Sequence, residues 1–487
     1  MEFLRTKQKK IVTEKGEEVF LRGTAVGGWM NMENFINGFP GTESALKEVM
    51  EQRLGKEKTT LFFENMMDNF LNEEDIKFIS STGVNCVRLA VNYRHFEDDE
   101  NPYVYKEEGF RRLKNVLALC EKYHIYAILD MHAIQGYQNT HWHSDNARGI
   151  SLFWRDKQYQ ERYYALMQEM AHRFKDMPAL AGYELFNEPS SNCPYGDYPY
   201  NMYENYISDY SRYNAVVFKS VEKIREVDSK HIIFIEGDSY GHNFMGLEEP
   251  FDDNLVYSSH DYIISGFGPG KYPGFYETLH NDRVEERAYW DYEKQINHIC
   301  ETEGWKFSEK YQVPLWVGEF GSQYCTGEED NIYRLKSMDD QLRAFKELGI
   351  HWTTWTYKDC GVMGWVTLSP DSDYLKHIEP VQKMKGLLGA ENFTAWRSSC
   401  PGKEVTRDFT EYMMEILGQS SSYTMGTFQK CMGYALLTGF AAGVLQPEYA
   451  ELFQECNEEE IKEMLKSFRL ENCNVNEQLI SIIRKNL

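Results

Sequence analysis

Residues 156–187 read DKQYQERYYALMQEMAHRFKDMPALAGYELFN, and this stretch contains one helix–strand unit. Over Asp156–Phe174 the apolar residues recur every three or four positions, which predicts an amphipathic helix. Leu180–Asn187 is a short, almost continuously apolar run, which is typical of a strand buried on both faces of a parallel sheet. The stretch therefore predicts parallel strands covered by helices.

The same alternation continues along most of the chain. Further helical patterns cover Glu108–Tyr123, Tyr203–Glu226, Glu285–Tyr311 and Ile332–Leu348. The other candidate strands are Val19–Gly27, Asn85–Tyr93, Tyr126–Ala133, His231–Asp238, Leu255–Tyr262, Pro314–Gly321 and His351–Lys358. Eight strand–helix units over about 360 residues predict an α/β fold of the (β/α)8, or TIM-barrel, class. A doubly wound open sheet is the alternative, but no Gly-x-Gly-x-x-Gly follows any strand, which argues against a dinucleotide site.

The pattern changes beyond Cys360. One helical stretch lies near Asp373–Leu388, and from about residue 404 the whole remainder is predicted helical. The clearest helical segments there are Arg407–Leu417, Phe428–Val444, Glu459–Phe468 and Val475–Lys485. We therefore expect residues 1–400 to form a barrel with long loops. Residues 401–487 would supply the closing barrel helix and a small helical extension.

Composition and charge narrow the function classes. The 487 residues carry 52 Lys and Arg against 76 Asp and Glu, a formal net charge of −24. Such a chain repels phosphate backbones, and without a local basic patch nucleic-acid binding is not expected. The 33 Tyr and 10 Trp provide flat surfaces of the kind that stack on sugar rings, although most aromatic side chains fill cores.

No segment is expected to enter a membrane or a secretory pathway. The basic N-terminus is not followed by an apolar run of the signal-peptide type, and the apolar run Met432–Leu445 is too short to span a bilayer. The ten cysteines form no Cys-x-x-Cys pair, and Cys86, Cys120 and Cys300 lie in apolar periodic contexts. Reduced, buried thiols in a cytoplasmic protein are the economical interpretation.

Two glutamates end predicted strands. The fourth strand leads into Asn187-Glu188-Pro189, and the seventh ends in Gly318-Glu319-Phe320. Barrel enzymes place their active groups at the carboxyl ends of the strands, so both carboxyls are expected at one mouth. Cleavage of a glycosidic bond needs one protonated and one ionised carboxyl group. A glutamate at the end of an apolar run is costly to bury without a function.

Further motifs occur in order at the strand ends. They are Val-Arg88-Leu-Ala, Asp130-Met-His132, Asn187-Glu188-Pro189, His260-Asp-Tyr262, Gly318-Glu319-Phe320 and Trp355 in Trp-Thr-Tyr-Lys. With these motifs the chain resembles glycoside hydrolase family 5, whose members are retaining β-glycosidases built on a (β/α)8 barrel. The resemblance covers roughly residues 18–360, and the ordered set is far more specific than a lone Asn-Glu-Pro.

The resemblance implies roles for the charged residues. Glu188 would be the general acid and then the general base, with its pKa lifted so that it holds a proton at working pH. Glu319 would be the nucleophile that forms a covalent glycosyl-enzyme. Arg88 would keep Glu319 ionised, and Tyr262 would hydrogen-bond to Glu319 from the side.

The resemblance also implies sugar-binding residues. Asn187 would hold the sugar 2-hydroxyl, and Trp355 would form the floor under the cleaved sugar. His132 and His260 would line the site as hydrogen-bond donors. His132, His141 and His143 are not expected to bind a metal, because the His-x-His spacing is awkward and no cysteine lies near. The chemistry needs no cofactor.

Two longer stretches resemble the exo-β-1,3-glucanase-like and β-glucosidase-like branches of the family. The first is Gly27-Gly28-Trp29-Met-Asn-Met-Glu33, whose glutamate would bind hydroxyls of the terminal, non-reducing sugar, with Trp29 in the same wall. The second is the third-strand loop from Asp130 to Asn139, and Asn139 belongs to its motif. A carboxylate that grips the last sugar closes the cleft into a pocket and favours exo action.

The sequence therefore predicts a retaining β-glycosidase that hydrolyses β-glucosidic bonds from the non-reducing end of short oligosaccharides or small glucosides. The alternatives are an endo-acting β-glucanase or transglycosylase with an open cleft, and a non-catalytic sugar-binding barrel, against which the presence of both glutamates argues. The expected partner is a carbohydrate or glycoside. The C-terminal helices fit either a surface for homo-oligomer formation or a packing face within a monomer.

Overall fold

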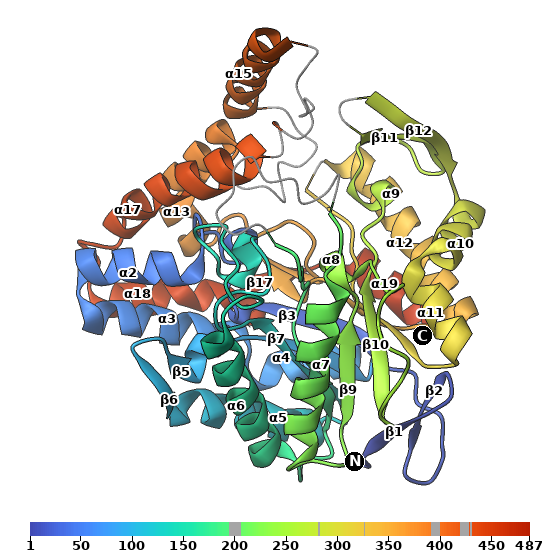
Figure 1. The fold of residues 1–487 in the computed structure, drawn as a ribbon. Helices are drawn as coiled ribbons and strands as arrows, with labels where there is room; N and C mark the ends of the chain where they lie inside the picture. Colours follow the sequence, from blue (N-terminus) through green and yellow to red (C-terminus); the bar gives the residue numbers. More distant parts are fainter. Residues whose placement is uncertain (194–205, 281–282, 326, 391–399, 419–427, 429–430) are drawn as a thin grey trace.

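The computed structural model describes residues 1–193, 206–280, 283–325, 327–390, 400–418, 428 and 431–487. Its centre is a closed barrel of eight parallel strands, in which the last pairs with the first (Figure 1). The strands are β3 (Arg22–Met30), β4 (Cys86–Asn92), β7 (Tyr126–Ala133), β8 (Leu180–Glu184), β9 (Ile232–Glu236), β10 (Leu255–His260), β13 (Leu315–Glu319) and β14 (His351–Thr354). Each strand overlaps a predicted one, so the (β/α)8 fold is confirmed.

The inside of the barrel is apolar at one end and charged at the other. Alternate residues of each strand point inward. Near the amino ends of the strands these are apolar and form one buried cluster that includes Cys86, Ile128, Phe234 and Trp316. The hairpin β1 (Leu4–Lys7) and β2 (Lys10–Thr13) adds Leu4 and Ile11 to this cluster and so covers that end. Two residues further along β4 and β7, the inward positions hold Arg88 and Asp130.

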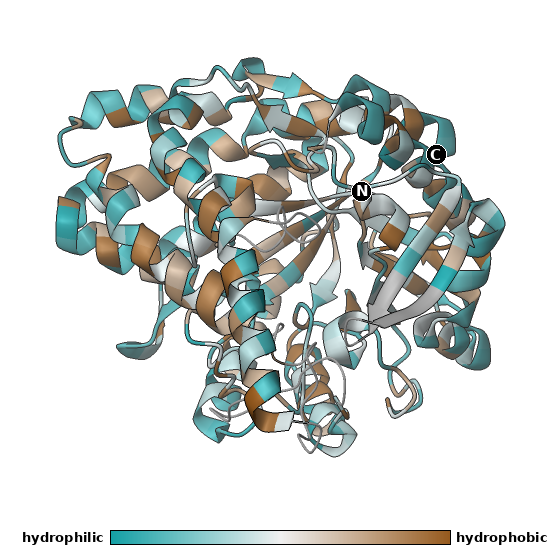
Figure 2. Cartoon of the chain, turned by 90° about the horizontal axis from the view of Figure 1, so that it is seen from above, coloured by the Kyte–Doolittle hydropathy of each residue, from teal (hydrophilic) through white to brown (hydrophobic). Residues whose placement is uncertain are grey.

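Helices surround the barrel and turn their apolar faces toward it (Figure 2). They are α2 (Glu43–Leu54), α3 (Lys56–Phe70), α4 (Glu73–Ser81), α5 (Glu107–Lys122), α6 (Lys157–Phe174), α7 (Tyr210–Arg225), α10 (Tyr292–Glu301), α11 (Glu303–Tyr311) and α12 (Glu328–Leu348). The helix expected from residue 203 begins at Tyr210, and residues 203–205 lie outside the described part.

The expected helix over Glu285–Tyr311 is wrong at its start. Residues Arg283–Trp290 form strand β12, which pairs antiparallel with β11 (Gly274–His280) within the loop after β10. The sequence of β12 contains Val284, Tyr289 and Trp290, residue types that favour strands, and β11 offers a partner with which to form a ladder. Figure 1 shows this hairpin above the barrel, at the end where the strands finish.

The C-terminal region packs along the barrel helices. It contains α13 (Asp373–Leu388), α15 (Pro401–Leu417), a π-helical segment η4 (Met432–Ala441), α17 (Ala442–Glu451), α18 (Glu458–Leu465) and α19 (Glu477–Asn486). Helix α17 packs on α2, α18 on α3 and α19 on α12. The expectation of helix throughout is wrong at β17 (Cys473–Val475), which pairs antiparallel with β16 (Val366–Leu368) and so gains a ladder that residue spacing alone does not indicate.

A buried ammonium ion ties this region to the barrel. Lys358 Nζ donates to Asp75 Oδ1 and to the carbonyl oxygens of Phe70 and Phe468, each at 2.7 Å. Both charged side chains are fully buried. The C-terminal helices are thus joined to the segment that follows β14, while the division of the chain at residue 400 stays a prediction.

Other sequence expectations can be compared directly. Cys86, Cys120 and Cys300 form no disulfide; the first two are buried and the third is half-buried. In the part of the chain that the structure describes, no helix is both long enough and apolar enough to cross a membrane.

Candidate active site

Arg88 organises the charged end of the barrel. Its guanidinium is fully buried, and Nη1 donates to Glu319 Oε1 at 2.7 Å. Nε donates to Glu184 Oε2 at 2.5 Å, and Nη2 donates to Asn187 Oδ1 at 2.8 Å. Nη2 also lies 3.1 Å from Asp130 Oδ2. One cation therefore contacts four side chains from three strands or their ends, and it places a positive charge beside Glu319.

Glu319 ends β13 and is held at both carboxylate oxygens. Arg88 occupies Oε1, and the Tyr262 hydroxyl donates to Oε2 at 2.8 Å. His260 Nδ1 lies 3.8 Å from the same Oε2. The side chain is only 6% exposed. A buried carboxylate fixed by two strong donors is oriented and available to attack a carbon atom placed above it.

Glu188 lies four residues after the end of β8. His260 Nδ1 is 2.8 Å from its Oε1, and His143 Nε2 is 3.1 Å from its Oε2. Burial raises the pKa of Glu188, although His143 and Arg88 counteract this. Its backbone φ is +49°, and its carbonyl oxygen accepts a hydrogen bond from Asn139 Nδ2 at 2.9 Å. A carboxyl group with a raised pKa suits a proton donor.

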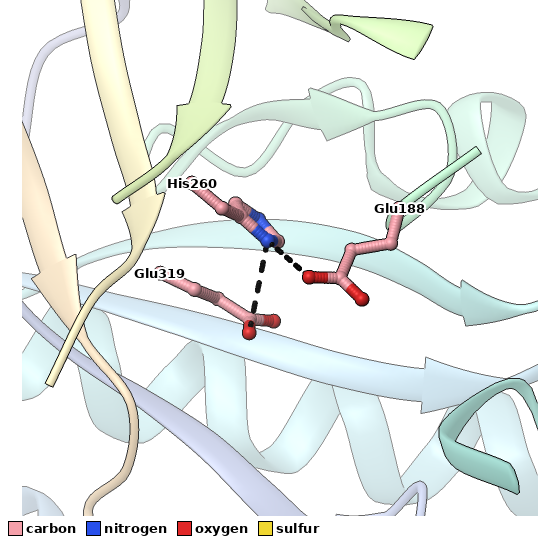
Figure 3. Close-up of side chains that lie close together, drawn as sticks. All are labelled: Glu188, His260 and Glu319. Atoms are coloured by element: carbon pink, nitrogen blue, oxygen red, sulfur yellow. Dashed lines mark hydrogen bonds and ion pairs between the residues drawn. The ribbon is translucent and has the colours of Figure 1, made fainter. Parts of the chain in front are cut away.

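The two glutamates face each other across His260 (Figure 3). One carboxylate oxygen of Glu188, one of Glu319 and a ring nitrogen of His260 all lie within 4.8 Å of one another. Retaining glycosidases hold their carboxyl groups about 5–5.5 Å apart, whereas inverting enzymes need about 6.5–9.5 Å to admit a water molecule. This separation matches the retaining class.

These three side chains could also be read as metal ligands. The Arg88 guanidinium, however, already lies 2.7 Å from Glu319 Oε1 and would repel a cation bound there. The hydrogen bonds from Arg88, Tyr262 and His260 account for the positions of the two carboxyl groups without a metal.

Glu33 and His132 form another wall of the site. Glu33 follows β3 and is 3% exposed, with Oε1 3.2 Å from His132 Nε2. Burial raises the pKa of Glu33 well above its usual value, and the charges of Glu319 and Glu188 raise it further. The carboxyl group of Glu33 therefore lies within electrostatic reach of Glu188 and Glu319, at the same mouth of the barrel.

Trp355 and Asn187 complete that wall. The His132 ring stacks on Trp355, with ring centroids 5.1 Å apart and planes inclined by 6°. His132 Nδ1 is 2.6 Å from Asp130 Oδ2, and burial lowers the pKa of His132 to about 3, so the ring is neutral. Asn187 Nδ2 lies 3.3 Å from His132 Nε2. Indole, imidazole, amide and carboxyl groups together present the mixture of a flat face and polar edges that a sugar ring requires.

The structure adds carboxyl groups that sequence reasoning missed. Glu184 accepts hydrogen bonds from Arg88 and, at 2.7 Å, from the Ser258 hydroxyl. Glu236 ends β9, and its Oε2 accepts the Glu188 backbone N–H at 3.0 Å. Burial raises the pKa of Glu236 well above its usual value, as do Glu184 and Glu188. Each follows an apolar run, the same signal that identified Glu188 and Glu319.

The roles predicted for Asn139 and Trp29 stay predictions, although the structure gives the position of each residue. Asn139 supports the backbone of Glu188. Trp29 is 1% exposed, and its indole N–H has no hydrogen-bond partner among the described residues. His143, for which the sequence predicted no catalytic role, contacts Glu188 directly. The His143 position shows that the third-strand loop folds back over the catalytic pair.

Comparison with known proteins agrees with this geometry. A family model described as cellulase, glycosyl hydrolase family 5, matches residues 48–361. The chain belongs to glycosyl hydrolase family 5. A β-xylosidase of Phanerodontia chrysosporium is 32% identical over 490 residues, and the match covers 97% of this chain and 96% of that protein.

Two further matches are more distant. A glucan 1,3-beta-glucosidase of Yarrowia lipolytica is 26% identical over 387 residues, which cover 71% of this chain and 85% of that one. The crystal structure of an endogalactoceramidase superposes with a TM-score of 0.50 at 17% identity, over 74% of this chain and 76% of that one. The second of these matches shows a shared fold alone. The match to the β-xylosidase extends over the C-terminal region as well as the barrel.

Proposed function

We propose that this family 5 enzyme is a retaining β-glycosidase that removes one sugar from the non-reducing end of short β-linked oligosaccharides or small β-glucosides. The observation that carries the proposal is the position of Glu33, a buried carboxyl group whose pKa is raised by burial and by the nearby charges of Glu319 and Glu188. A carboxyl group there would accept the outer hydroxyls of a terminal sugar and leave no path for a longer chain.

In the first step Glu319 attacks the anomeric carbon while Glu188 gives its proton to the departing oxygen. The hydrogen bonds from Arg88 and Tyr262 hold the attacking carboxylate in place. The bond from carbon to the leaving oxygen breaks, and an ester bond to Glu319 forms. Glu188 is then ionised, and the neutral ring of His260 remains within hydrogen-bonding distance of it.

In the second step the ionised Glu188 takes a proton from a water molecule that enters where the leaving group was. The hydroxide oxygen attacks the anomeric carbon, the ester bond breaks and Glu319 is released. Two displacements on one carbon give a product of the original, β, configuration. Asn187 is placed to hold the 2-hydroxyl of the sugar, since its side chain is fixed by Arg88 beside the nucleophile.

A β-xyloside is the second candidate substrate. The relative that matches 97% of this chain is a β-xylosidase. Xylose differs from glucose in lacking the hydroxymethyl group at C5, so discrimination depends on the space that the site leaves for that group. Glucosides stay the first candidate because the Gly-Gly-Trp-x-x-x-Glu stretch resembles the glucosidase-like branches.

A comparison of substrates distinguishes β-glucosides from β-xylosides and exo from endo action. Aryl β-glucosides and aryl β-xylosides with the same leaving group would be compared by kcat/KM, together with β-linked disaccharides. An oligosaccharide whose non-reducing end is chemically blocked provides the control. We expect turnover of the substrates with a free non-reducing end and no turnover of the blocked oligosaccharide. Cleavage of the blocked oligosaccharide would show endo action and contradict the proposal.

A further inference from the structure

A second pocket, of about 420 Å³, lies between the third-strand loop and the C-terminal helices. One wall consists of residues 140–142 and 146–149 and the start of α2, and the other of residues in η4 and α17. Its size falls within the range of small-molecule sites. The functions assigned above make no use of it.

The loop wall of this pocket carries unsatisfied polar groups. The hydroxyls of Thr42 and Thr140 are buried, with the residues 4% and 5% exposed, and neither has a hydrogen-bond partner among the described residues. Buried polar atoms are rarely left unpaired in proteins. Arg148 lines the same wall and is exposed. The wall therefore offers hydroxyls and a guanidinium to a ligand that brings matching polar atoms.

The helix wall is apolar. Phe440, in η4, is 66% exposed, and Val444, in α17, is 53% exposed, and both line the pocket. Small residues such as Gly439 and Gly443 leave these side chains uncovered. Binding of a ligand that covers apolar groups facing a pocket lowers the free energy, because it removes apolar surface from water. The pocket is thus polar on one side and apolar on the other.

The pocket adjoins the proton donor. His143 Nε2 lies 3.1 Å from Glu188 Oε2, and the ring of His141 lies 5.3 Å from that of His143. His141 also lines the pocket. These two imidazole rings thus connect the lining of the pocket to Glu188. The oxygen that Glu188 protonates belongs to the leaving group, so the rest of the leaving group extends from Glu188 past the third-strand loop.

We propose that this pocket binds the leaving group of the glycoside, and that the group is an amphipathic alcohol with polar atoms near the glycosidic oxygen and an apolar portion beyond them. The proposal rests on the function proposed above. It assigns the C-terminal helices a part in substrate recognition, since Phe440 and Val444 would cover the apolar portion while Thr140 and Thr42 receive the polar atoms.

The test compares two substrates with the same sugar. Octyl β-glucoside has a leaving group long enough to reach the helix wall, whereas β-glucosyl fluoride has a leaving group of one atom. In Phe440→Ala we expect the ratio of kcat/KM for octyl β-glucoside to kcat/KM for the fluoride to fall about tenfold, the effect of uncovering one large apolar side chain. Phe409→Ala is the matched control, because Phe409 is 49% exposed on α15 and does not line the pocket.

Each outcome has one meaning. A fall in the ratio in Phe440→Ala and not in Phe409→Ala supports the proposal. An unchanged ratio in Phe440→Ala overturns it, and so does a loss confined to cellobiose, whose leaving group is a sugar. Failure of the unmodified enzyme to hydrolyse the fluoride would instead contradict the proposed function itself. Turnover of the fluoride by each variant shows that the variant is folded.

Discussion

Oε1 of Glu236 faces Nε2 of His260 at 3.6 Å, and neither atom has a hydrogen-bond partner among the described residues. Both side chains are buried, and burial lowers the pKa of His260 to about 3, so the imidazole is neutral. The pKa of Glu236 is raised well above its usual value by burial and by Glu184 and Glu188. We expect a protonated Glu236 to turn its O–H toward Nε2, which favours the tautomer with the ring proton on Nδ1, the nitrogen that lies 2.8 Å from Glu188 Oε1.

This relationship predicts different effects for two substitutions of Glu236. Glu236→Gln keeps an oxygen for the Glu188 backbone N–H and an N–H for His260, so kcat/KM should stay within a few-fold of the unmodified enzyme. Glu236→Leu removes both, and we expect a loss of about 100-fold, within the usual effect of misplaced acid–base groups. The pH dependence of kcat/KM should move in Glu236→Leu and not in Glu236→Gln. Equal losses in the two variants would show that Glu236 does not act as a neutral donor.

Glu33 should contribute to binding of the terminal sugar. Above the pKa of Glu33, which burial raises, its ionised carboxylate can accept two hydrogen bonds from sugar hydroxyls, each worth about 1.5–3 kcal/mol. Glu33→Gln should therefore lower kcat/KM by one to several orders of magnitude, at about 1.4 kcal/mol per tenfold. Part of the loss should appear in kcat, because binding energy away from the reacting atoms helps to distort the ring.

Deoxy substrates provide the control for Glu33. A glycoside that lacks the hydroxyl bound by Glu33 should react more slowly with the unmodified enzyme, and Glu33→Gln should add little further loss. If Glu33→Gln hydrolyses the complete substrate at the normal rate, the exo interpretation loses its support and an open cleft becomes the better account.

The pH dependence of the first step should report Glu188. Its raised pKa keeps the carboxyl group protonated to higher pH, and the acid form is lost as the pH rises through that pKa. The basic limb of the kcat/KM profile should therefore fall with this ionisation for poor leaving groups. In Glu188→Gln, 2,4-dinitrophenyl glycosides should still form the glycosyl-enzyme, because they depart without a proton, and the basic limb should be absent. A basic limb that persists in this variant would assign it to another residue.

The buried pair Lys358 and Asp75 should govern stability. Lys358→Met leaves the Asp75 carboxylate and two carbonyl groups without their donor, and removal of one partner of a buried pair costs about 3–5 kcal/mol. Urea unfolding measures the difference. Adding Asp75→Asn removes the uncompensated charge and should restore part of the loss. An unchanged unfolding midpoint in Lys358→Met would show that the link to Phe468 carries little free energy.

The sequence predicted the barrel, and the position of two glutamates at its mouth, because both depend on local order. Each strand is an apolar run, and Glu188 and Glu319 stand directly at the ends of such runs. The hairpin of β11 and β12 was missed because its ladder depends on a partner strand rather than on the spacing within one segment. Glu236 was missed for a related reason. Its end-of-strand position was visible, but its contact with His260 depends on how β9 and β10 lie in the barrel.

Cytoplasmic location, self-association through the C-terminal helices and a place for Trp29 in the wall of the sugar site stay predictions. The prediction for Trp29 is the easiest of the three to test. Its fluorescence would respond to sugar binding only if the ring contacts the ligand or moves with it. A Trp29→Phe variant that keeps the full fluorescence change on binding would place Trp29 outside the wall.

The most direct measurement is the identification of the residue that becomes glycosylated. A 2-deoxy-2-fluoro-β-glucosyl fluoride forms the glycosyl-enzyme and hydrolyses slowly, because fluorine at C2 destabilises the oxocarbenium-like transition states. Mass spectrometry of the intact protein and of its peptides then locates the label, and the 2-deoxy-2-fluoro-xylosyl analogue serves the second candidate substrate. The account predicts one sugar per chain, attached to Glu319, and no label in Glu319→Gln. A label on any other residue, or product of α configuration with no covalent intermediate, would contradict it.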